Sequence, residues 1–98
     1  MKIIAVNISK QYKNETLLNA TRRAWILDIN KCKDFDYVIG VVIGDIFSYF
    51  RKVNVMPDRE IRRVCFDLEK CSNDEELEIR NYISSHNIKL RGFVTKYI

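Results

Sequence analysis

The 98-residue chain contains little histidine, cysteine, proline or glycine. Its single histidine, His86, and three cysteines without a Cys-x-x-Cys spacing argue against a structural zinc site. One proline and three glycines leave little room for flexible linkers, which predicts a single domain over residues 1–98. The longest apolar run, residues 37–44, is far too short to span a bilayer, so we expect no membrane partner.

The cysteine content also bears on the cellular compartment. The chain has an odd number of cysteines, namely Cys32, Cys65 and Cys71. The apolar segment 3–6 is short and is followed by polar residues, which does not fit a secretory signal. We therefore expect reduced thiols and a cytoplasmic location, which would be a bacterial host cell if the protein is phage-encoded.

Residue types that usually carry catalysis do not converge in the sequence. No serine stands in a Gly-x-Ser-x-Gly motif, and no glycine-rich loop fits a phosphate cradle. Cysteine–histidine catalysis would need His86, whose place before Asn87 is more typical of a helix end. The acidic run 74–78 suits the start of a helix, where negative charge is favourable. We expect a protein that is not an enzyme and has no cofactor.

Hydrophobic periodicity predicts an α+β fold with five strands and two short helices. A polar connection is expected over 30–36, a type II′ hairpin at Gly44-Asp45, and a break in the pattern at 54–58. The continuously apolar strand 37–43 favours burial on both sides, and hence a small curled or half-closed antiparallel β-barrel with helices at its ends. The expected strands are 2–8, 37–43, 46–53, 61–68 and 92–98, and the expected helices run from Asn14 to about Trp25 and from a capping box at Ser72 to about Ser84.

Basic residues outnumber acidic ones by seventeen to thirteen, for a formal charge of +4. Residues 1–14 and 79–98 contain lysine and arginine but no acid. Chain termini often lie close together, so these two segments would form one basic face. The alternative is an ordinary solvated surface.

The segment around Trp25 is the best candidate for binding. Arg22 and Arg23 carry planar charged groups that pair with phosphate oxygens, and Trp25 would stand about one helical turn away, where it could stack on a base. The competing interpretation makes the lone tryptophan a core anchor and leaves the arginines solvated or paired with Glu15 and Asp28. The predicted ligand-binding residues are Thr21, Arg22, Arg23, Trp25, Arg51, Arg80 and Lys96.

Four segments of the chain look familiar. They are Leu17-Leu18-x-Ala20-Thr21-Arg22-x-x-Trp25, Asp36–Ile46, Arg63-Val64-Cys65-Phe66 and Ile79-Arg80-Asn81-Tyr82-Ile83. Together they resemble a family of small bacterial and phage proteins. That family looks like a PUA-like pseudo-barrel, the architecture of EVE, ASCH and YTH domains, which implies a nucleic-acid or modified-base reader with an aromatic wall beside basic residues. Of the site residues, Thr21, Arg22 and Trp25 match residue by residue, whereas Arg23 replaces a small residue and Val42 an aromatic one.

Three functions are compatible with these patterns. The first is a non-catalytic PUA-like protein that binds a nucleotide or nucleic acid through a basic and aromatic surface. The second is a phage-type protein that sequesters a free or cyclic nucleotide signal and so inhibits host defence. The third is a protein-interaction module or inhibitor, which could form a homo-oligomer.

Overall fold

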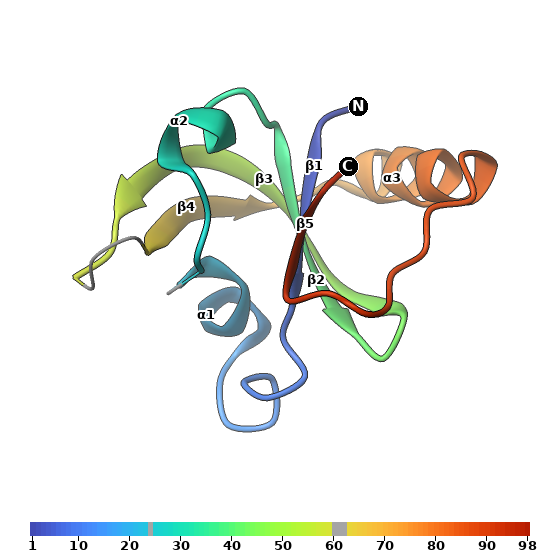
Figure 1. Cartoon of the computed structure of the whole chain (residues 1–98). Helices are drawn as coiled ribbons and strands as arrows, with labels where there is room; N and C mark the ends of the chain where they lie inside the picture. The colour runs from blue at the N-terminus through green and yellow to red at the C-terminus, as the bar shows by residue number, and fades with distance from the viewer. Residues whose placement is uncertain (24, 60–62) are drawn as a thin grey trace.

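The computed structural model describes residues 1–23, 25–59 and 63–98. These residues form a five-stranded sheet and three short helices, one helix more than predicted (Figure 1). The strands are β1 (Ile3–Asn7), β2 (Tyr37–Val42), β3 (Asp45–Pro57), β4 (Val64–Lys70) and β5 (Thr95–Tyr97), and the helices are α1 (Leu17–Arg22), α2 (Ile29–Cys32) and α3 (Asn73–Ser85).

The sheet is mixed and open. Its strand order is β4-β3-β2-β1-β5, in which β1 and β2 run parallel and every other pair is antiparallel. Because β4 and β5 stand at opposite edges, the sheet does not close and the predicted barrel is not confirmed. The two chain ends do lie side by side, as expected, since the backbone N–H of Ile3 donates to the carbonyl of Ile98.

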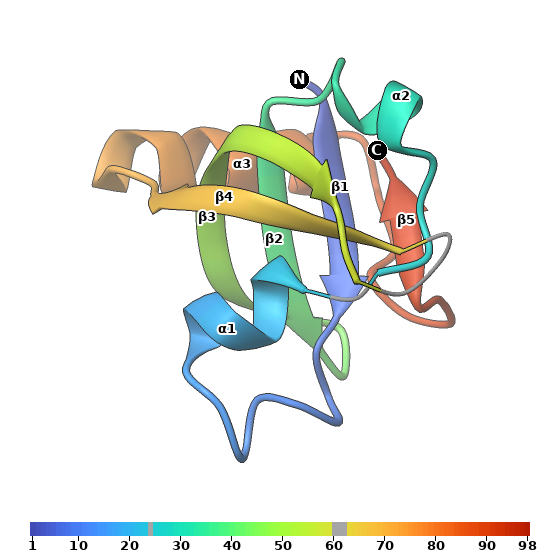
Figure 2. The same ribbon diagram turned by 90° about the vertical axis from the view of Figure 1, so that its left-hand side faces the viewer.

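The open sheet is strongly curled. In Figure 2, β4 crosses in front of β2 and β1. Phe66 of β4 and Val6 of β1 belong to one buried cluster although two strands separate them in the sheet order. A register shift between Lys52 and Asn54 interrupts β3 without ending it. The predicted break at 54–58 is therefore wrong, because a β-bulge absorbs the irregularity and the strand continues to Pro57.

Helices cover both faces of the sheet, with α1 and α2 on one side and α3 on the other (Figures 1 and 2). The central strands β1 and β2 are buried on both faces, which explains why their sequences are almost continuously apolar. The α1 side contains Ile4, Val6, Val38 and Val42, and the α3 side contains Ile3, Ala5, Ile39 and Val41.

Helix α1 is shorter at both ends than the periodicity predicts. Thr16, not Asn14, caps it, because the Thr16 Oγ1 accepts a hydrogen bond of 3.2 Å from the Asn19 N–H. The helix ends at Arg22, and Arg23 is already extended, with φ −123° and ψ 152°. Trp25 then lies in a short β-bridge, so the predicted helix carrying it is wrong.

Helix α2 was not predicted from the sequence, whereas helix α3 was. Helix α2, capped by Asp28, occupies part of the predicted polar connection. In α3 the predicted capping box is present: the Ser72 Oγ accepts from the Glu75 N–H, and the Glu75 carboxylate accepts from the Ser72 N–H. Asn87 has φ +53°, as predicted for a helix end, whereas Leu77 is exposed and does not belong to the buried stripe.

The β2–β3 hairpin is confirmed, with its loop one residue earlier than predicted. Val42 pairs with Asp45, so Ile43 and Gly44 form the two-residue loop. Both have positive φ, 47° and 81°, which is the pattern of a type I′ turn. The predicted type II′ turn at Gly44-Asp45 is therefore wrong, because the glycine takes the second loop position.

Candidate functional site

The end of α1 and the connection after β3 form a basic cleft of about 340 Å³. Three arginines and a single carboxylate line it, so positive charge is in excess. Two of these arginines, Arg22 and Arg23, were predicted from the sequence, and Arg59 was not. The lining residues are Arg22, Arg23, Pro57, Asp58, Arg59 and Cys65. We call this cavity the arginine cleft.

An ion pair joins the two sides of the arginine cleft. The Arg23 Nη2 lies 3.4 Å from the Asp58 Oδ1, which also accepts a hydrogen bond of 2.6 Å from the Arg59 N–H. The Asp58 side chain is only 6% exposed, whereas that of Arg23 is 53% exposed. Asp58 therefore positions Arg23 while much of the guanidinium still faces solvent. The sequence analysis considered Glu15 and Asp28 as partners for the two arginines, but Arg23 pairs with Asp58 instead.

Arg22 differs from Arg23 in its partners. It is half-buried at the last position of α1. Within residues 1–23, 25–59 and 63–98, its guanidinium forms no hydrogen bond or ion pair with another side chain. A guanidinium has five N–H donors in a planar fork that fits phosphate or carboxylate oxygens. Arg22 thus presents to the cleft a donor group that is available to an anion.

Thr21 has an internal role. Its side chain is fully buried, and its hydroxyl donates to the Leu17 carbonyl at 2.7 Å. The Thr21 Oγ1 also lies 2.8 Å from the Ser48 Oγ, which accepts a hydrogen bond from the Gly40 N–H at 3.0 Å. A Cβ atom at Gly40 would overlap the Ser48 hydroxyl. This buried chain of hydrogen bonds holds α1 against β2 and β3, and so fixes the position of Arg22.

Trp25 is a core residue, as the competing interpretation of the sequence held. Its side chain is 4% exposed, and its Nε1 donates a 2.7 Å hydrogen bond to the Thr21 carbonyl near the end of α1. Its backbone N–H and C=O pair with Val64 at 3.2 and 2.9 Å. This long-range bridge requires extended chain, which is why the helix stops before Trp25.

A second cavity, of about 260 Å³, lies where the chain leaves β1. Trp25 lines this cavity and not the arginine cleft, so the structure separates the predicted aromatic group from the predicted phosphate-binding arginines. The lining residues are Asn7, Ser9, Lys10, Gln11, Trp25, Ile26, Arg63 and Val94. We call this cavity the Gln11 pocket.

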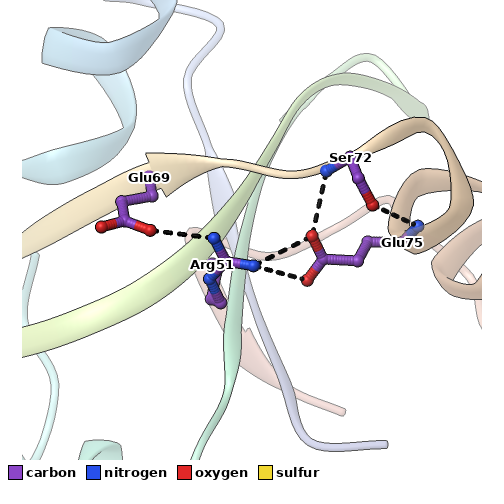
Figure 3. Close-up of polar contacts among 4 residues, drawn as sticks. All are labelled: Arg51, Glu69, Ser72 and Glu75. Atoms are coloured by element: carbon purple, nitrogen blue, oxygen red, sulfur yellow. Dashed lines mark hydrogen bonds and ion pairs between the residues drawn. The ribbon is translucent and has the colours of Figure 1, made fainter.

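Arg51, another predicted site residue, is held by two carboxylates (Figure 3). Its Nη2 lies 2.8 Å from a Glu69 oxygen, and its Nη1 lies 3.1 Å from a Glu75 oxygen. The hydrogen bond from the Ser72 backbone, with a further contribution from Arg51, lowers the pKa of Glu75. The positive charge of Arg51 is therefore already matched within the protein.

Arg80 and Lys96 also lie apart from the arginine cleft. The Arg80 Nε donates to the Tyr49 hydroxyl at 3.1 Å, and its guanidinium lies 5.6 Å from the centre of the Tyr49 ring. The Lys96 Nζ donates to the Lys89 carbonyl at 3.2 Å. These residues belong to α3 and β5, and neither lines the cleft that contains Arg22.

The three cysteines are free, as predicted. Burial raises the pKa of Cys32, and it raises that of Cys71 to about 11, so both remain protonated thiols near neutral pH. Cys65 is partly exposed and lines the arginine cleft. It is the accessible thiol of the chain.

No three His, Cys, Asp or Glu side chains come together as a metal site would require, over the part of the chain that the structure describes. In the same residues, no helix has both the length and the apolar character needed to cross a membrane. Comparisons with protein-family models, curated protein sequences and solved structures gave no match. The geometry of the two cavities is therefore the basis for assigning a function.

Proposed function

We propose that this protein binds a nucleotide or a nucleic acid without catalysis, and that the arginine cleft holds its phosphates. The observation that carries the proposal is the meeting of Arg22, Arg23 and Arg59 in one cleft, where Arg22 has no side-chain partner among the described residues. Guanidinium groups bind phosphate oxygens through paired, charge-assisted hydrogen bonds. Such contacts recognise the backbone of a nucleic acid independently of its sequence.

The cleft is partly preorganised for such an anion. Asp58 orients Arg23 through the 3.4 Å ion pair and accepts from the Arg59 backbone. The chain of hydrogen bonds from Gly40 through Ser48 to Thr21 fixes the end of α1, and with it the backbone that carries the Arg22 side chain. Side chains that are already positioned lose less conformational entropy when a ligand binds.

We also propose that the fold is related to the PUA-like, half-closed pseudo-barrel that the sequence resembles. The curl of the sheet across its α1 face supports it. The open edges of the sheet and the parallel β1–β2 pair depart from the predicted antiparallel barrel. The family resemblance stays a prediction.

A second candidate is the sequestering of a free nucleotide in a cytoplasmic, phage-encoded setting. The Gln11 pocket favours it, because a cavity of about 260 Å³ suits one small molecule better than a polymer. Salt dependence separates the two candidates. Polymer binding weakens steeply with salt, since each phosphate contact releases counterions, whereas a single nucleotide in a pocket has few contacts to lose.

The test is an anisotropy titration of fluorescent single-stranded DNA and RNA at several salt concentrations. If three arginines contact three phosphates, a plot of log affinity against log salt has a slope of about −2, at roughly −0.7 for each contact on a single strand. Arg22→Ala should weaken binding and reduce the slope by about 0.7. The matched control is Arg91→Ala, since Arg91 does not line the cleft and donates to the Ile43 carbonyl. A chain that binds neither polymer nor free nucleotide would contradict both candidates.

A further inference from the structure

The charges that line the arginine cleft do not balance. Three guanidinium groups and one carboxylate leave an excess of two positive charges. An anion with two negative charges therefore matches the cleft better than an anion with one. A phosphate monoester carries about 1.5 to 2 negative charges near neutral pH, whereas each internal phosphate of a nucleic-acid strand carries one.

The hydrogen-bond donors of the three arginines are largely unused. Within the described residues, no hydrogen bond or ion pair joins the side chain of Arg22 or of Arg59 to another residue. Arg23 uses one nitrogen, Nη2, to contact Asp58, and its side chain remains 53% exposed. Each guanidinium has five N–H donors. A monoester offers these donors three terminal oxygens, whereas a phosphate within a strand offers two.

One carboxylate brings two of the arginines to the same point of the cleft. The Asp58 Oδ1 accepts a hydrogen bond of 2.6 Å from the Arg59 N–H and lies 3.4 Å from the Arg23 Nη2. Arg22 adjoins Arg23 in the chain and lines the same cavity. This proximity favours an arrangement of three arginines around one phosphate over an arrangement along several phosphates of a strand.

The wall of the arginine cleft offers no surface on which a base could stack. Among the described residues that line it, none is aromatic. Trp25, the aromatic residue nearest to Arg22 in the sequence, lines the Gln11 pocket instead. The cleft therefore contacts phosphate groups and not bases, and the distinction that it can make is between kinds of phosphate.

We infer that the arginine cleft binds a terminal phosphate, that is, a phosphate monoester at the end of a nucleic-acid strand or on a mononucleotide. The inference rests on the proposed function and deepens it by naming the kind of phosphate that the cleft selects. In the alternative arrangement, the three arginines contact successive internal phosphates of a strand, and the group at the end of the strand has no effect on affinity.

The experiment compares short single strands of one sequence that differ only at the 5′ end, which is a free hydroxyl, a phosphate monoester or the methyl ester of that phosphate. Their affinities are measured by isothermal titration calorimetry. We expect the monoester to bind at least tenfold more tightly than the other two, because methylation removes one negative charge and one acceptor of charge-assisted hydrogen bonds. The same three groups at the 3′ end test the opposite terminus, and a preference for the monoester at either end supports the inference.

A second pair of ligands tests free nucleotides in the same way. Adenosine 5′-monophosphate has a phosphate monoester, whereas adenosine 3′,5′-cyclic monophosphate has the same base and sugar with a phosphodiester. We expect the monoester to bind at least tenfold more tightly here as well. If the monophosphate shows this preference and no strand binds, the ligand is a free nucleotide and the inference stands.

Arg59→Ala assigns the preference to the arginine cleft. Arg59 is exposed and its side chain has no partner among the described residues, so the urea midpoint should not change. The ratio of the affinities for the monoester and the methyl ester should fall several-fold, because one of the three guanidinium groups is lost. The matched control is Arg91→Ala, an arginine outside the cleft, which should keep the full ratio. An unchanged ratio in Arg59→Ala would place the monoester elsewhere and overturn the inference.

The outcomes also separate this inference from the proposed function. Strands that bind equally well with all three end groups, together with equal affinities for the two adenosine nucleotides, would overturn the terminal-phosphate inference and leave the proposed function in place. If neither strands nor nucleotides bind, the proposed function fails, and the inference fails with it.

Discussion

Arg22 and Arg51 are both predicted binding residues, and they lie in contrasting surroundings. Arg51 lies between Glu69 and Glu75, with N···O distances of 2.8 and 3.1 Å (Figure 3). Arg22 lines a cleft with two further arginines and has no side-chain partner in the described residues. The difference is one of local charge: two carboxylates match Arg51, whereas three arginines and one carboxylate line the cleft that contains Arg22.

The largest effect on this comparison should come from Gly40→Ala, which disturbs the support of the arginine cleft. A methyl group there would overlap the Ser48 hydroxyl and would lie 2.8 Å from the Thr21 Oγ1. We expect the free energy of unfolding to fall by about 1–3 kcal/mol, measured by urea denaturation, and oligonucleotide affinity to fall with it.

The control for Gly40→Ala is the double variant with Ser48→Ala, which removes the overlapping hydroxyl. The two losses in unfolding free energy should sum to more than the loss in the double variant, since the residues share one contact. Strict additivity would show that Gly40 is not required for the close approach of Ser48.

Arg22→Ala should give the next largest effect, on binding and not on stability. A hydrogen bond to a charged group is worth about 1.5–3 kcal/mol, which corresponds to at least a tenfold loss of oligonucleotide affinity. The unfolding free energy should change by no more than about 0.5 kcal/mol, because the Arg22 guanidinium forms no hydrogen bond or ion pair with another side chain among the described residues. A large loss of stability would instead identify Arg22 as a structural residue.

Arg51→Ala should show the reverse pattern. It leaves Glu69 and Glu75 beside each other without their shared cation, so the urea midpoint should decrease slightly and recover at high salt. Oligonucleotide affinity should remain that of the unmodified protein. A loss of affinity equal to that of Arg22→Ala would show that the comparison between the two arginines is wrong.

The smallest expected effect is the pH dependence of stability that comes from Glu75, which lies beside Arg51 and Ser72. The Ser72 backbone and Arg51 lower the pKa of Glu75 in the folded protein. A lowered pKa stabilises the fold above the pKa of the unfolded state, and this stabilisation is lost as pH falls through the folded value. The difference in stability between the protein and Glu75→Gln should therefore shrink on acidification from pH 7 to pH 3, as followed by urea denaturation. A constant difference would show that Glu75 does not titrate with a lowered pKa.

Local patterns account for most of the secondary structure. The Ser72 capping box and the alternation of Val64 and Phe66 predicted α3 and β4, because these signals depend on near neighbours in the chain. The helix boundary at Arg22 was missed because it depends on Trp25 pairing with Val64, thirty-nine positions further along the sequence.

The candidate site was only partly predictable for the same reason. Arg22 and Arg23 are adjacent and carry a local signal, whereas Arg59 joins them only when the fold brings the end of β3 to α1. The pairing of Arg51 with Glu69 is likewise a product of the β3–β4 register.

The central claim is that the arginine cleft holds phosphate, and Cys65 reports on it directly. Because Cys65 lines the cleft while Cys32 and Cys71 are buried, a thiol reagent such as a dithiobis-nitrobenzoate should modify Cys65 first. The measurement is the rate of that modification with and without a saturating single-stranded oligonucleotide. The account predicts a rate several-fold slower with the oligonucleotide, and an oligonucleotide concentration for half-maximal protection that is at least tenfold higher in Arg22→Ala. An unchanged rate under conditions where anisotropy shows the oligonucleotide bound would place the phosphates elsewhere and contradict the claim.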